Sequence, residues 1–305
     1  MKFTIKKNKF NIERFCSKEK PLLPNFSDEK FKSIYFHQIK YENTKTGGLR
    51  FKNIFKKSYK DYPLISVIVP NLNGKNLRNT IDSILKQTYP NIEIIVIDGG
   101  SKEQNILFLN DEYLDEVDYW ISEKDEGIYD GWNRGLEVAL GDYIGIINSN
   151  DIFYENAFNY LIKYIKNYSN YDFILGAVEK HKVYAGFRPE EINLRFNIHP
   201  STVVGFFIKL ESQKKVGLYN LKYKCSSDYD MFYRLIKKQK MRGIPTKGNE
   251  VFGKFELTGY SSTLGFFDHL KEEIQIRYDN KQNIFVLIYI FIGRCFVKLM
   301  NVIKN

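Results

Sequence analysis

The chain has 305 residues, a formal net charge of +10 and 43% hydrophobic residues. This balance is typical of a globular protein, excludes a disordered chain, and allows one large domain or two small ones. The 3 cysteines (Cys16, Cys225 and Cys295) are far apart, which excludes a disulfide framework or a thiolate zinc cage and indicates a reducing compartment. The N-terminus lacks the apolar core of a signal peptide, and no uncharged apolar stretch reaches the roughly 20 residues of a membrane-spanning helix.

The excess positive charge lies at the two ends of the chain. Residues 1–60 hold 16 Lys and Arg against 5 Asp and Glu, and residues 271–305 hold 6 against 3. Such ends are either solvated surface or contacts for nucleic acid or an anionic membrane. Nucleic acid is disfavoured, because we find no zinc spacing, no RNP-type aromatic motif and no helix-turn-helix pattern.

The elements of an alternating fold follow in chain order. Residues 1–62 are polar and irregular, and we expect a basic N-terminal extension with short strands. Buried parallel strands are predicted at Ile65–Val69 and Ile92–Ile97, because both runs are short, continuous and β-branched. Apolar spacing predicts a helix between them, over Leu77–Leu85. The remaining predictions are a helix up to about Leu114, a strand near Tyr119–Ile121, a helix over Ile128–Leu140 and a strand over Asp142–Ile147.

This alternation predicts an α/β domain with a mostly parallel sheet, in which ligands bind off the carboxyl ends of the strands. Polar clusters stand at three such ends: Asn71–Asn73, Asp98–Ser101 and Asn148–Asp151. The glycine-rich dinucleotide fingerprint, the P-loop and the serine nucleophile elbow are missing from the sequence, which disfavours a dehydrogenase, a P-loop NTPase and an α/β-hydrolase. A nucleotide site built from Asp and Asn side chains remains.

Each cluster also has a purely structural interpretation. Asp98 either accepts hydrogen bonds from a base or ribose or caps the next helix. The oxygens of Asn148–Asp151 either hold Mg²⁺ or Mn²⁺ on a diphosphate or form a turn. Asp228 and Asp230 face different ways on a helix, so they are not a paired acid and base. One of them is a general base, or both only favour the helix N-terminus.

An apolar run marks the C-terminal segment. Ile284–Gly293 is followed by Arg294 and Lys298. The run is too short to span a bilayer comfortably, so we expect a helix lying in the membrane interface with the two cations towards the headgroups. A core helix or a dimer helix is the alternative.

Taken in order, four stretches resemble family 2 glycosyltransferases of the GT-A fold, the inverting group that builds bacterial surface polysaccharides. They are Pro63–Gly74 with Thr80–Ser101, Trp120–Asp151, His199–Ser201 and Ser226–Leu235. Gly47–Ser58 is similar to the lead-in of the colanic-acid and O-antigen branch. The resemblance covers residues 47–262, and its order, spacing and strand ends agree with one another.

The resemblance implies an α/β fold of the GT-A type: a Rossmann-like, mostly parallel mixed sheet flanked by helices. The basic N-terminal extension occupies residues 1–62. The glycosyltransferase domain occupies residues 63–262, with a nucleotide-binding half (63–151) and an acceptor half (152–262). For residues 263–305, which lie outside the resemblance, we expect C-terminal amphipathic helices, and their association with a membrane is a hypothesis.

The resemblance also implies roles for individual residues. The nucleotide sugar is expected to contact Pro70, Asn71, Asn73, Asp98, Gly99, Asp125, Asn133, Asn148 and Ser149. Asp228 matches the general base. Asn150 and Asp151 match the metal-binding D-x-D element, although Asn148 and Asn150 occupy both Asp positions, so the need for Mn²⁺ or Mg²⁺ stays open. His199 lies beside the acceptor or the diphosphate, or is a loop residue.

The implied function is inverting transfer of a sugar, from a UDP-hexose or a related nucleotide sugar, to a lipid-linked glycan, lipopolysaccharide or capsule acceptor. The implied location is the inner face of the plasma membrane, and nucleic acid is not an expected partner. The alternative is a catalytically impaired GT-A domain that binds a nucleotide sugar or a partner. The Asn substitutions favour that alternative, whereas Asp228 and Asp151 argue against it. Tyr129 and Trp132 either stack on a sugar or pack a helix into the core.

Overall fold

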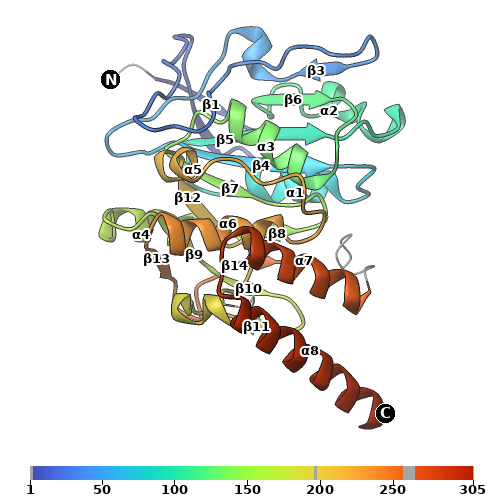
Figure 1. Ribbon diagram of the computed structural model, residues 1–305. Coiled ribbons are helices and arrows are strands. Elements are labelled where there is room, and N and C mark those ends of the chain that lie inside the picture. The colour runs from blue at the N-terminus through green and yellow to red at the C-terminus, as the bar shows by residue number, and fades with distance from the viewer. Residues whose placement is uncertain (1–2, 196–197, 257–264, 305) are drawn as a thin grey trace.

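The computed structural model describes residues 3–195, 198–256 and 265–304. Its centre is an eight-stranded mixed sheet in the order β13-β9-β12-β7-β4-β5-β6-β3 (Figure 1). The strands are β3 (Lys45–Gly47), β4 (Ile65–Asn71), β5 (Ile92–Asp98), β6 (Tyr119–Ser122), β7 (Tyr143–Ile146), β9 (Phe173–Leu175), β12 (Phe206–Lys209) and β13 (Gly243–Pro245). Strands β6, β5, β4 and β7 run parallel, and β3 and β12 are antiparallel to their neighbours.

The two predicted parallel strands form the middle of the sheet. Every residue of β4 and β5 is buried, as a strand covered on both faces requires. Their register pairs Asn71 with Asp98, so two of the predicted polar clusters end side by side. The predicted α/β fold is confirmed, and the polar residues that end β4 and β5 lie together at the carboxyl ends of the strands.

Helices cover both faces of this sheet. They are α1 (Leu77–Leu85), α2 (Phe108–Asp111), α3 (Ile128–Val138), α4 (Ala157–Asn167), α5 (Leu210–Val216) and α6 (Ser227–Tyr233). Helix α1 buries Leu77, Ile81, Ile84 and Leu85 on one side, which is the predicted spacing. The predicted helix up to about Leu114 is wrong in extent, because the structure has only a short 3-10 turn and the four-residue α2 there.

A smaller sheet in the order β11-β10-β14-β8 lies beside the main one. Its strands are β8 (Ile152–Phe153), β10 (Ala177–Glu179), β11 (Val183–Tyr184) and β14 (Val251–Lys254). Phe252 of β14 packs on Phe207 of β12, with ring centroids 6.0 Å apart, so the two sheets share a core. The expected boundary between residues 262 and 263 lies outside the described residues.

The N-terminal extension is bound to the main domain. Strands β1 (Thr4–Lys7) and β2 (Glu13–Cys16) form a hairpin, and β3 adds an antiparallel edge to the main sheet. Lys9 pairs with Asp82 at 2.8 Å and Lys52 with Asp115 at 2.8 Å. Part of the N-terminal positive charge therefore neutralises carboxylates of the acidic middle of the chain.

A buried ion pair reinforces this attachment. Arg50 is 1% exposed and donates to the Glu93 carboxylate at 2.8 Å, and also to the carbonyls of Val138 and Tyr35 at 2.7 and 3.0 Å. Glu93 in turn accepts a hydrogen bond from Ser66 at 2.6 Å. The pair therefore fixes the segment that precedes β4 against strand β5 of the main sheet.

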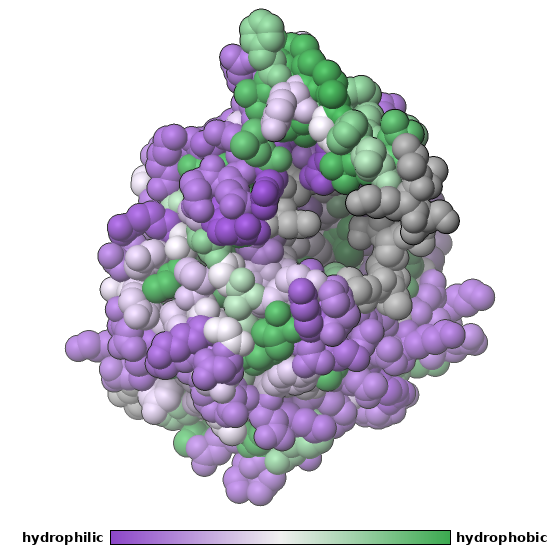
Figure 2. Space-filling view, turned by 90° about the horizontal axis from the view of Figure 1, so that it is seen from below, coloured by the Kyte–Doolittle hydropathy of each residue, from purple (hydrophilic) through white to green (hydrophobic). Residues whose placement is uncertain are grey.

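Helices α7 (Phe266–Asp279) and α8 (Ile284–Lys304) pack against each other, and α8 projects from the body of the protein (Figure 1). Leu287 and Ile290 are buried, whereas Phe285, Tyr289 and Phe296 are 77%, 69% and 61% exposed. Hydrophobic side chains gather at one end of the lower face of the molecule (Figure 2). Within the described residues, no helix combines the length and hydropathy needed to cross a bilayer.

The buried ion pair leads to a stability prediction. Arg50→Met leaves Glu93 charged, buried and short of a donor, so the free energy of unfolding should fall by about 3–5 kcal/mol in urea denaturation. Lys52→Met is the matched control, because its exposed pair with Asp115 should be worth less than about 1 kcal/mol. Equal losses in the two variants would contradict the attachment role of Arg50.

Candidate active site

The ends of β4, β5 and β6 meet at one carboxylate. Asp98 is fully buried and accepts hydrogen bonds from the side chains of Asn71 at 2.6 Å and Ser122 at 2.7 Å. The backbone N–H groups of Gly100 and Ser101 also donate to it, at 3.2 and 2.8 Å. Asp98 thus holds the loop after β5 in place, which agrees in part with its interpretation as a capping residue. It also orders the carboxyl ends of the strands, where a ligand would bind.

Asn73 and Ser149 lie next to this cluster. Asn73 has a left-handed backbone (φ 52°), and its side-chain oxygen accepts hydrogen bonds from Lys102 N–H and Asn105 at 3.0 and 2.9 Å. A Cβ atom on Gly74 would collide with Asn71 and Ser149, so the chain approaches both side chains closely there. An open cavity of about 540 Å³ beside Asn73 is lined by Lys75, Arg78 and Lys102 among others. Arg78 is paired with Glu112, so Lys75 and Lys102 give the cavity the positive charge that suits phosphate.

Asp125 faces the same edge from the loop before α3. A Cβ on Gly99 would lie 2.7 Å from the Asp125 carboxylate, and one on Gly131 would lie 3.5 Å from it and 3.7 Å from Pro70. Burial raises the pKa of Asp125, and its hydrogen bond from Gly127 N–H opposes that shift. Pro70, Gly99 and Asp125, which the resemblance implies as contacts of the nucleotide sugar, are therefore neighbours.

The third cluster follows β7. Asp151 accepts a hydrogen bond from Glu256 N–H at 2.8 Å through one carboxylate oxygen. The other oxygen, and the side-chain oxygen of Asn148, are buried and have no hydrogen-bond partner among the described residues. Burial raises the pKa of Asp151 from 3.8 to about 7. Since a hard divalent cation seeks such oxygens and takes further ligands from substrate phosphates, these residues fit Mg²⁺ or Mn²⁺.

The donor set is nevertheless weak. No group of three or more His, Cys, Asp and Glu side chains within the described ranges could hold a metal. Asn148 and Asn150 offer neutral oxygens only, and Asp151 binds a proton near neutral pH. A cation here would therefore depend on the charge of a bound diphosphate.

Asp228 lies in the first turn of α6 and is partly buried. Its carboxylate accepts hydrogen bonds from Thr202 at 2.9 Å, from Tyr129 at 3.2 Å and from the N–H of Tyr229 at 2.9 Å. Burial raises its pKa, and these three donors oppose the shift. A carboxylate with a raised pKa and fixed orientation is suited to accept a proton from a hydroxyl group.

Helix α3 connects Asp228 to the residues around Asp98 at the carboxyl ends of the parallel strands, here called the strand-end cluster. Tyr129 contacts Asp228 from its first turn, and Gly131, two residues further on, faces Asp125 and Pro70. Trp132 is 3% exposed and packs edge-on against Tyr129 and Tyr219, with centroids 5.0 Å apart in each pair. Trp132 is thus placed as a packing residue beneath the site.

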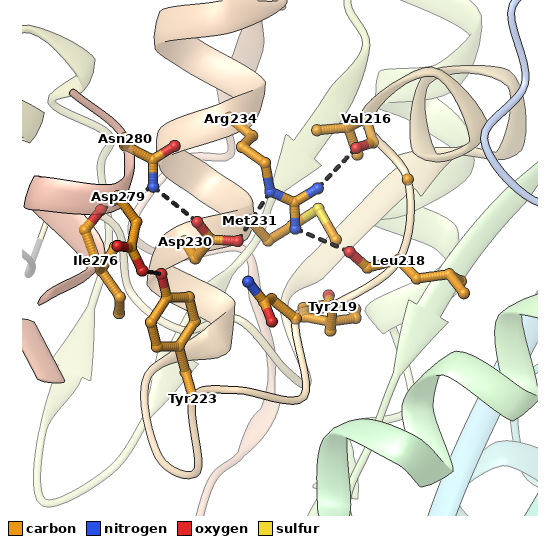
Figure 3. Close-up of polar contacts among 12 residues, drawn as sticks. Val216, Leu218, Tyr219, Tyr223, Asp230, Met231, Arg234, Ile276, Asp279 and Asn280 are labelled. Carbon is orange, nitrogen blue, oxygen red and sulfur yellow. Dashed lines mark hydrogen bonds and ion pairs between the residues drawn. The ribbon is translucent and has the colours of Figure 1, made fainter.

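A second polar network holds α6 in place (Figure 3). Asp230 is 4% exposed and accepts hydrogen bonds from Arg234 and Asn280, both at 2.8 Å. Arg234 also donates to the carbonyls of Val216 and Leu218, at 2.6 and 2.8 Å. Asp230 therefore anchors α6 to the end of α5 and to the end of α7, and Asp228 remains the one that faces the site.

Asn133 and His199, two of the predicted site residues, both contact neighbouring groups of the protein. The side-chain amide of Asn133 donates to Tyr219 C=O and accepts from Tyr219 N–H, both at 2.8 Å, so it braces the segment behind the site. The ring of His199 stacks on Phe232 of α6, with centroids 4.0 Å apart. Burial lowers the pKa of His199 to about 3, so its imidazole is neutral at physiological pH.

Lys180 and Thr202 are site residues that the sequence pattern does not indicate. Burial lowers the pKa of Lys180, and the charges of Asp151 and Asp228 oppose that shift, so this cation interacts electrostatically with both carboxylates. Lys180 follows β10 of the smaller sheet, which no motif marks. Thr202 directly follows His199–Ser201, and only its position beside that stretch hints at a role.

Comparisons with known proteins identify the class of this fold and site. Residues 66–234 match the model of glycosyl transferase family 2, and the chain belongs to that family. Over 190 residues it is 30% identical to an uncharacterized glycosyltransferase of Rickettsia typhi, covering 57% of this chain and 59% of that protein. It is 39% identical over 122 residues to the glycosyltransferase GlyG of Streptococcus pneumoniae, covering 36% of this chain and 40% of GlyG.

Solved structures share the fold at low identity. TarS of S. aureus in complex with UDP-GlcNAc superposes with a TM-score of 0.56 at 15% identity, covering 70% of this chain and 66% of that one. The mannosyltransferase PcManGT of Pyrobaculum calidifontis, in complex with GDP-Man and Mn²⁺, gives 0.55 at 15% identity, covering 75% and 66%. The predicted GT-A fold is confirmed, and the predicted enzyme class is confirmed at the level of the family.

The raised pKa of Asp151 leads to a prediction about stability and pH. The folded state holds this proton more tightly than the unfolded state, so the contribution of Asp151 to stability falls as the pH rises from about 4 to about 7. Asn at position 151 keeps an acceptor for Glu256 N–H and does not titrate. Asp151→Asn should therefore exceed wild type in free energy of unfolding by a margin that grows between these pH values and is constant above about pH 8.

The margin is measured by urea denaturation without added metal, at pH steps from 4 to 8.5. Asp61→Asn, at an exposed position, controls for the loss of one carboxylate. A margin for Asp151→Asn that shrinks as the pH rises would contradict the buried, protonated state of Asp151.

Proposed function

We propose that this protein is an inverting glycosyltransferase that moves a sugar from a nucleotide sugar to a hydroxyl group, with Asp228 as the general base. The observation that carries the proposal is the placement of Asp228, whose carboxylate is oriented by Tyr129 and Thr202. Tyr129 lies in the first turn of α3, and Gly131 in the same turn faces Asp125 and Pro70. A base on one side and a nucleotide-binding edge on the other are what a direct displacement needs.

The proposed step is a single displacement at the anomeric carbon. An acceptor hydroxyl attacks that carbon, and its proton passes to the Asp228 carboxylate. A new carbon–oxygen bond forms while the bond to the nucleoside diphosphate breaks, and the diphosphate leaves with the electron pair. Asp98 and Asn71 order the loops around the nucleotide, and the lysines beside Asn73 offset the negative charge of its phosphates.

A divalent cation would be held by Asn148, Asn150 and Asp151 together with the diphosphate. When bound, it would stabilise the charge that develops on the leaving group. Lys180 lies near Asp151 and Asp228 and would add to the same effect from the protein itself.

The proposed donor is a UDP-hexose, and the proposed acceptor is a lipid-linked glycan or a lipopolysaccharide or capsule precursor, as in the colanic-acid and O-antigen branch that Gly47–Ser58 resembles. A relative in Mycobacterium bovis, 27% identical over 180 residues, is named as a PGL/p-HBAD biosynthesis glycosyltransferase. We also propose that α8 lies on an anionic membrane surface at the cytoplasmic side, because its large exposed side chains are apolar and its charged residues are Arg294, Lys298 and Lys304.

The second candidate function is a domain that binds nucleotide sugar without turnover. The neutral Asn148 and Asn150 and the proton on Asp151 favour it. Turnover and binding measured on the same preparation separate the two functions.

The role of Asp228 leads to the first activity prediction. Asp228→Asn keeps the shape and the hydrogen-bond acceptor but not the base, so turnover should fall at least about a hundredfold. Donor affinity, measured by calorimetry with a UDP-sugar, should change little, because Asp228 faces the acceptor side. Turnover close to wild type would reject Asp228 as the base.

The metal leads to a separate prediction. Exhaustive chelation should reduce turnover, and Mn²⁺ added back should restore it. The affinity for UDP, measured by calorimetry with and without Mn²⁺, should rise with the ion, because the diphosphate supplies most of its ligand charge. If chelation changes neither turnover nor UDP affinity, the ion has no part in the mechanism. Lys180 would then be the cation near the leaving group.

A further inference from the structure

Two cavities lie between α8 and the smaller sheet, and both are bordered by Arg188. The outer cavity, of about 390 Å³, lies between α8 and the segment around residue 195. The inner cavity, of about 330 Å³, is lined by Lys180, Phe187 and His199 among others. Neither cavity includes Asp98 or any other residue of the strand-end cluster, so they form a region distinct from the proposed nucleotide site.

The outer cavity combines an apolar wall with arginines. Tyr289 and Val297 of α8 line it and are 69% and 57% exposed. Arg188, Arg195 and Arg294 border the same space, and their side chains are 50%, 63% and 44% exposed. Apolar surface beside guanidinium groups is complementary to a molecule with a hydrocarbon part and an anionic head.

Carboxylates nearby do not cancel this charge. Glu191 pairs with Arg188 and Arg195 at 3.2 and 3.6 Å. Glu273 pairs with Arg294 at 3.2 Å and with the buried Arg277 at 3.1 Å. Four arginines thus share two glutamates, and α8 contains no acidic residue. The outer cavity therefore keeps a net positive charge that attracts an anion.

The inner cavity is lined by residues that are connected to Asp228, the proposed base. His199 lines it and stacks on Phe232 of α6, and three residues further along the chain Thr202 donates to Asp228. Phe187 and Tyr184 give the cavity aromatic faces, which suit the apolar face of a sugar ring. Lys180 lines the same space and interacts electrostatically with Asp228.

We propose that the two cavities together bind one amphiphilic acceptor, a hydrocarbon chain joined through a phosphate or diphosphate to the sugar that is glycosylated. The hydrocarbon lies along α8, the phosphate lies among Arg188, Arg195 and Arg294, and the sugar enters the inner cavity with a hydroxyl towards Asp228. This proposal rests on the proposed function and adds the position and the anionic linkage of its acceptor.

The test is calorimetry on the full chain with farnesyl diphosphate, which joins a hydrocarbon chain to a diphosphate. UDP binding is measured first, and UDP is then kept saturating so that the nucleotide site is closed to the probe. Farnesol and inorganic diphosphate are titrated in the same way. Farnesyl diphosphate should bind at least about tenfold more tightly than either, since it alone meets both walls of the outer cavity.

The double variant Arg195→Ala with Arg294→Ala should lose at least about tenfold in affinity for farnesyl diphosphate and keep the UDP affinity of wild type. The matched control, Lys238→Ala with Arg242→Ala, removes the same charge at exposed positions that line neither cavity. Tyr289→Ser, which removes an exposed ring and no charge, should also weaken farnesyl diphosphate binding.

Vesicles of phosphatidylglycerol distinguish the acceptor's phosphate from bulk lipid headgroups. The arginine variant keeps Lys298 and Lys304, so a smaller loss of vesicle binding than of farnesyl diphosphate binding would support the acceptor site. Equal losses of the two, or equal affinities of the arginine variant and its control for farnesyl diphosphate, would overturn it. Failure of UDP to bind would instead reject the proposed function, and this is seen before the probe is added.

Discussion

A carboxylate without exposed surface must find its hydrogen-bond donors inside the protein, and Asp98 meets this constraint where three parallel strands end. Asn71 comes from β4, Ser122 from β6, and the N–H groups of Gly100 and Ser101 from the loop between β5 and α2. Any shift of one strand along its neighbour would leave a buried charge short of donors, at a cost of several kcal/mol. The carboxyl ends of these strands are therefore fixed before a ligand binds, and they hold the adjoining loops that carry Asn73 and Asp125.

The uneven charge of the chain acquires a structural meaning in the fold. The basic first sixty residues suggest an external anionic partner when read alone, yet Lys9 and Lys52 pair with Asp82 and Asp115 of the acidic middle. Arg50 is buried and neutralises Glu93 of the central strand β5. Much of this positive charge thus serves internal attachment, and the cations of the C-terminal segment, with Arg188 and Arg195, are those placed beside exposed apolar surface.

Local sequence patterns predict the sheet well because each central strand has a recognisable hydrophobic pattern. Ile65–Val69 and Ile92–Ile97 are β-branched runs that only a doubly covered strand accommodates, and their polar ends then mark the ligand edge. The region before Leu114 misleads, because its apolar residues have helical spacing but are folded into short turns. Lys180 and Thr202 escape prediction for a different reason. They reach the site through the pairing of β10 with β14 and through the path from His199 to β12, and such long-range contacts leave no periodic trace.

Helix α7 links the apolar helix to the base. Glu272 accepts hydrogen bonds from the N–H groups of Lys224 and Cys225 just before α6, at 2.5 and 3.0 Å. At its far end Asn280 donates to Asp230, while Glu273 pairs with Arg294 of α8. The turn that carries Asp228 is thus held by the same helix that supports α8. Since α6 is short and its first turn depends on these contacts, the geometry of the base and the position of the proposed membrane-facing helix are set by one shared element.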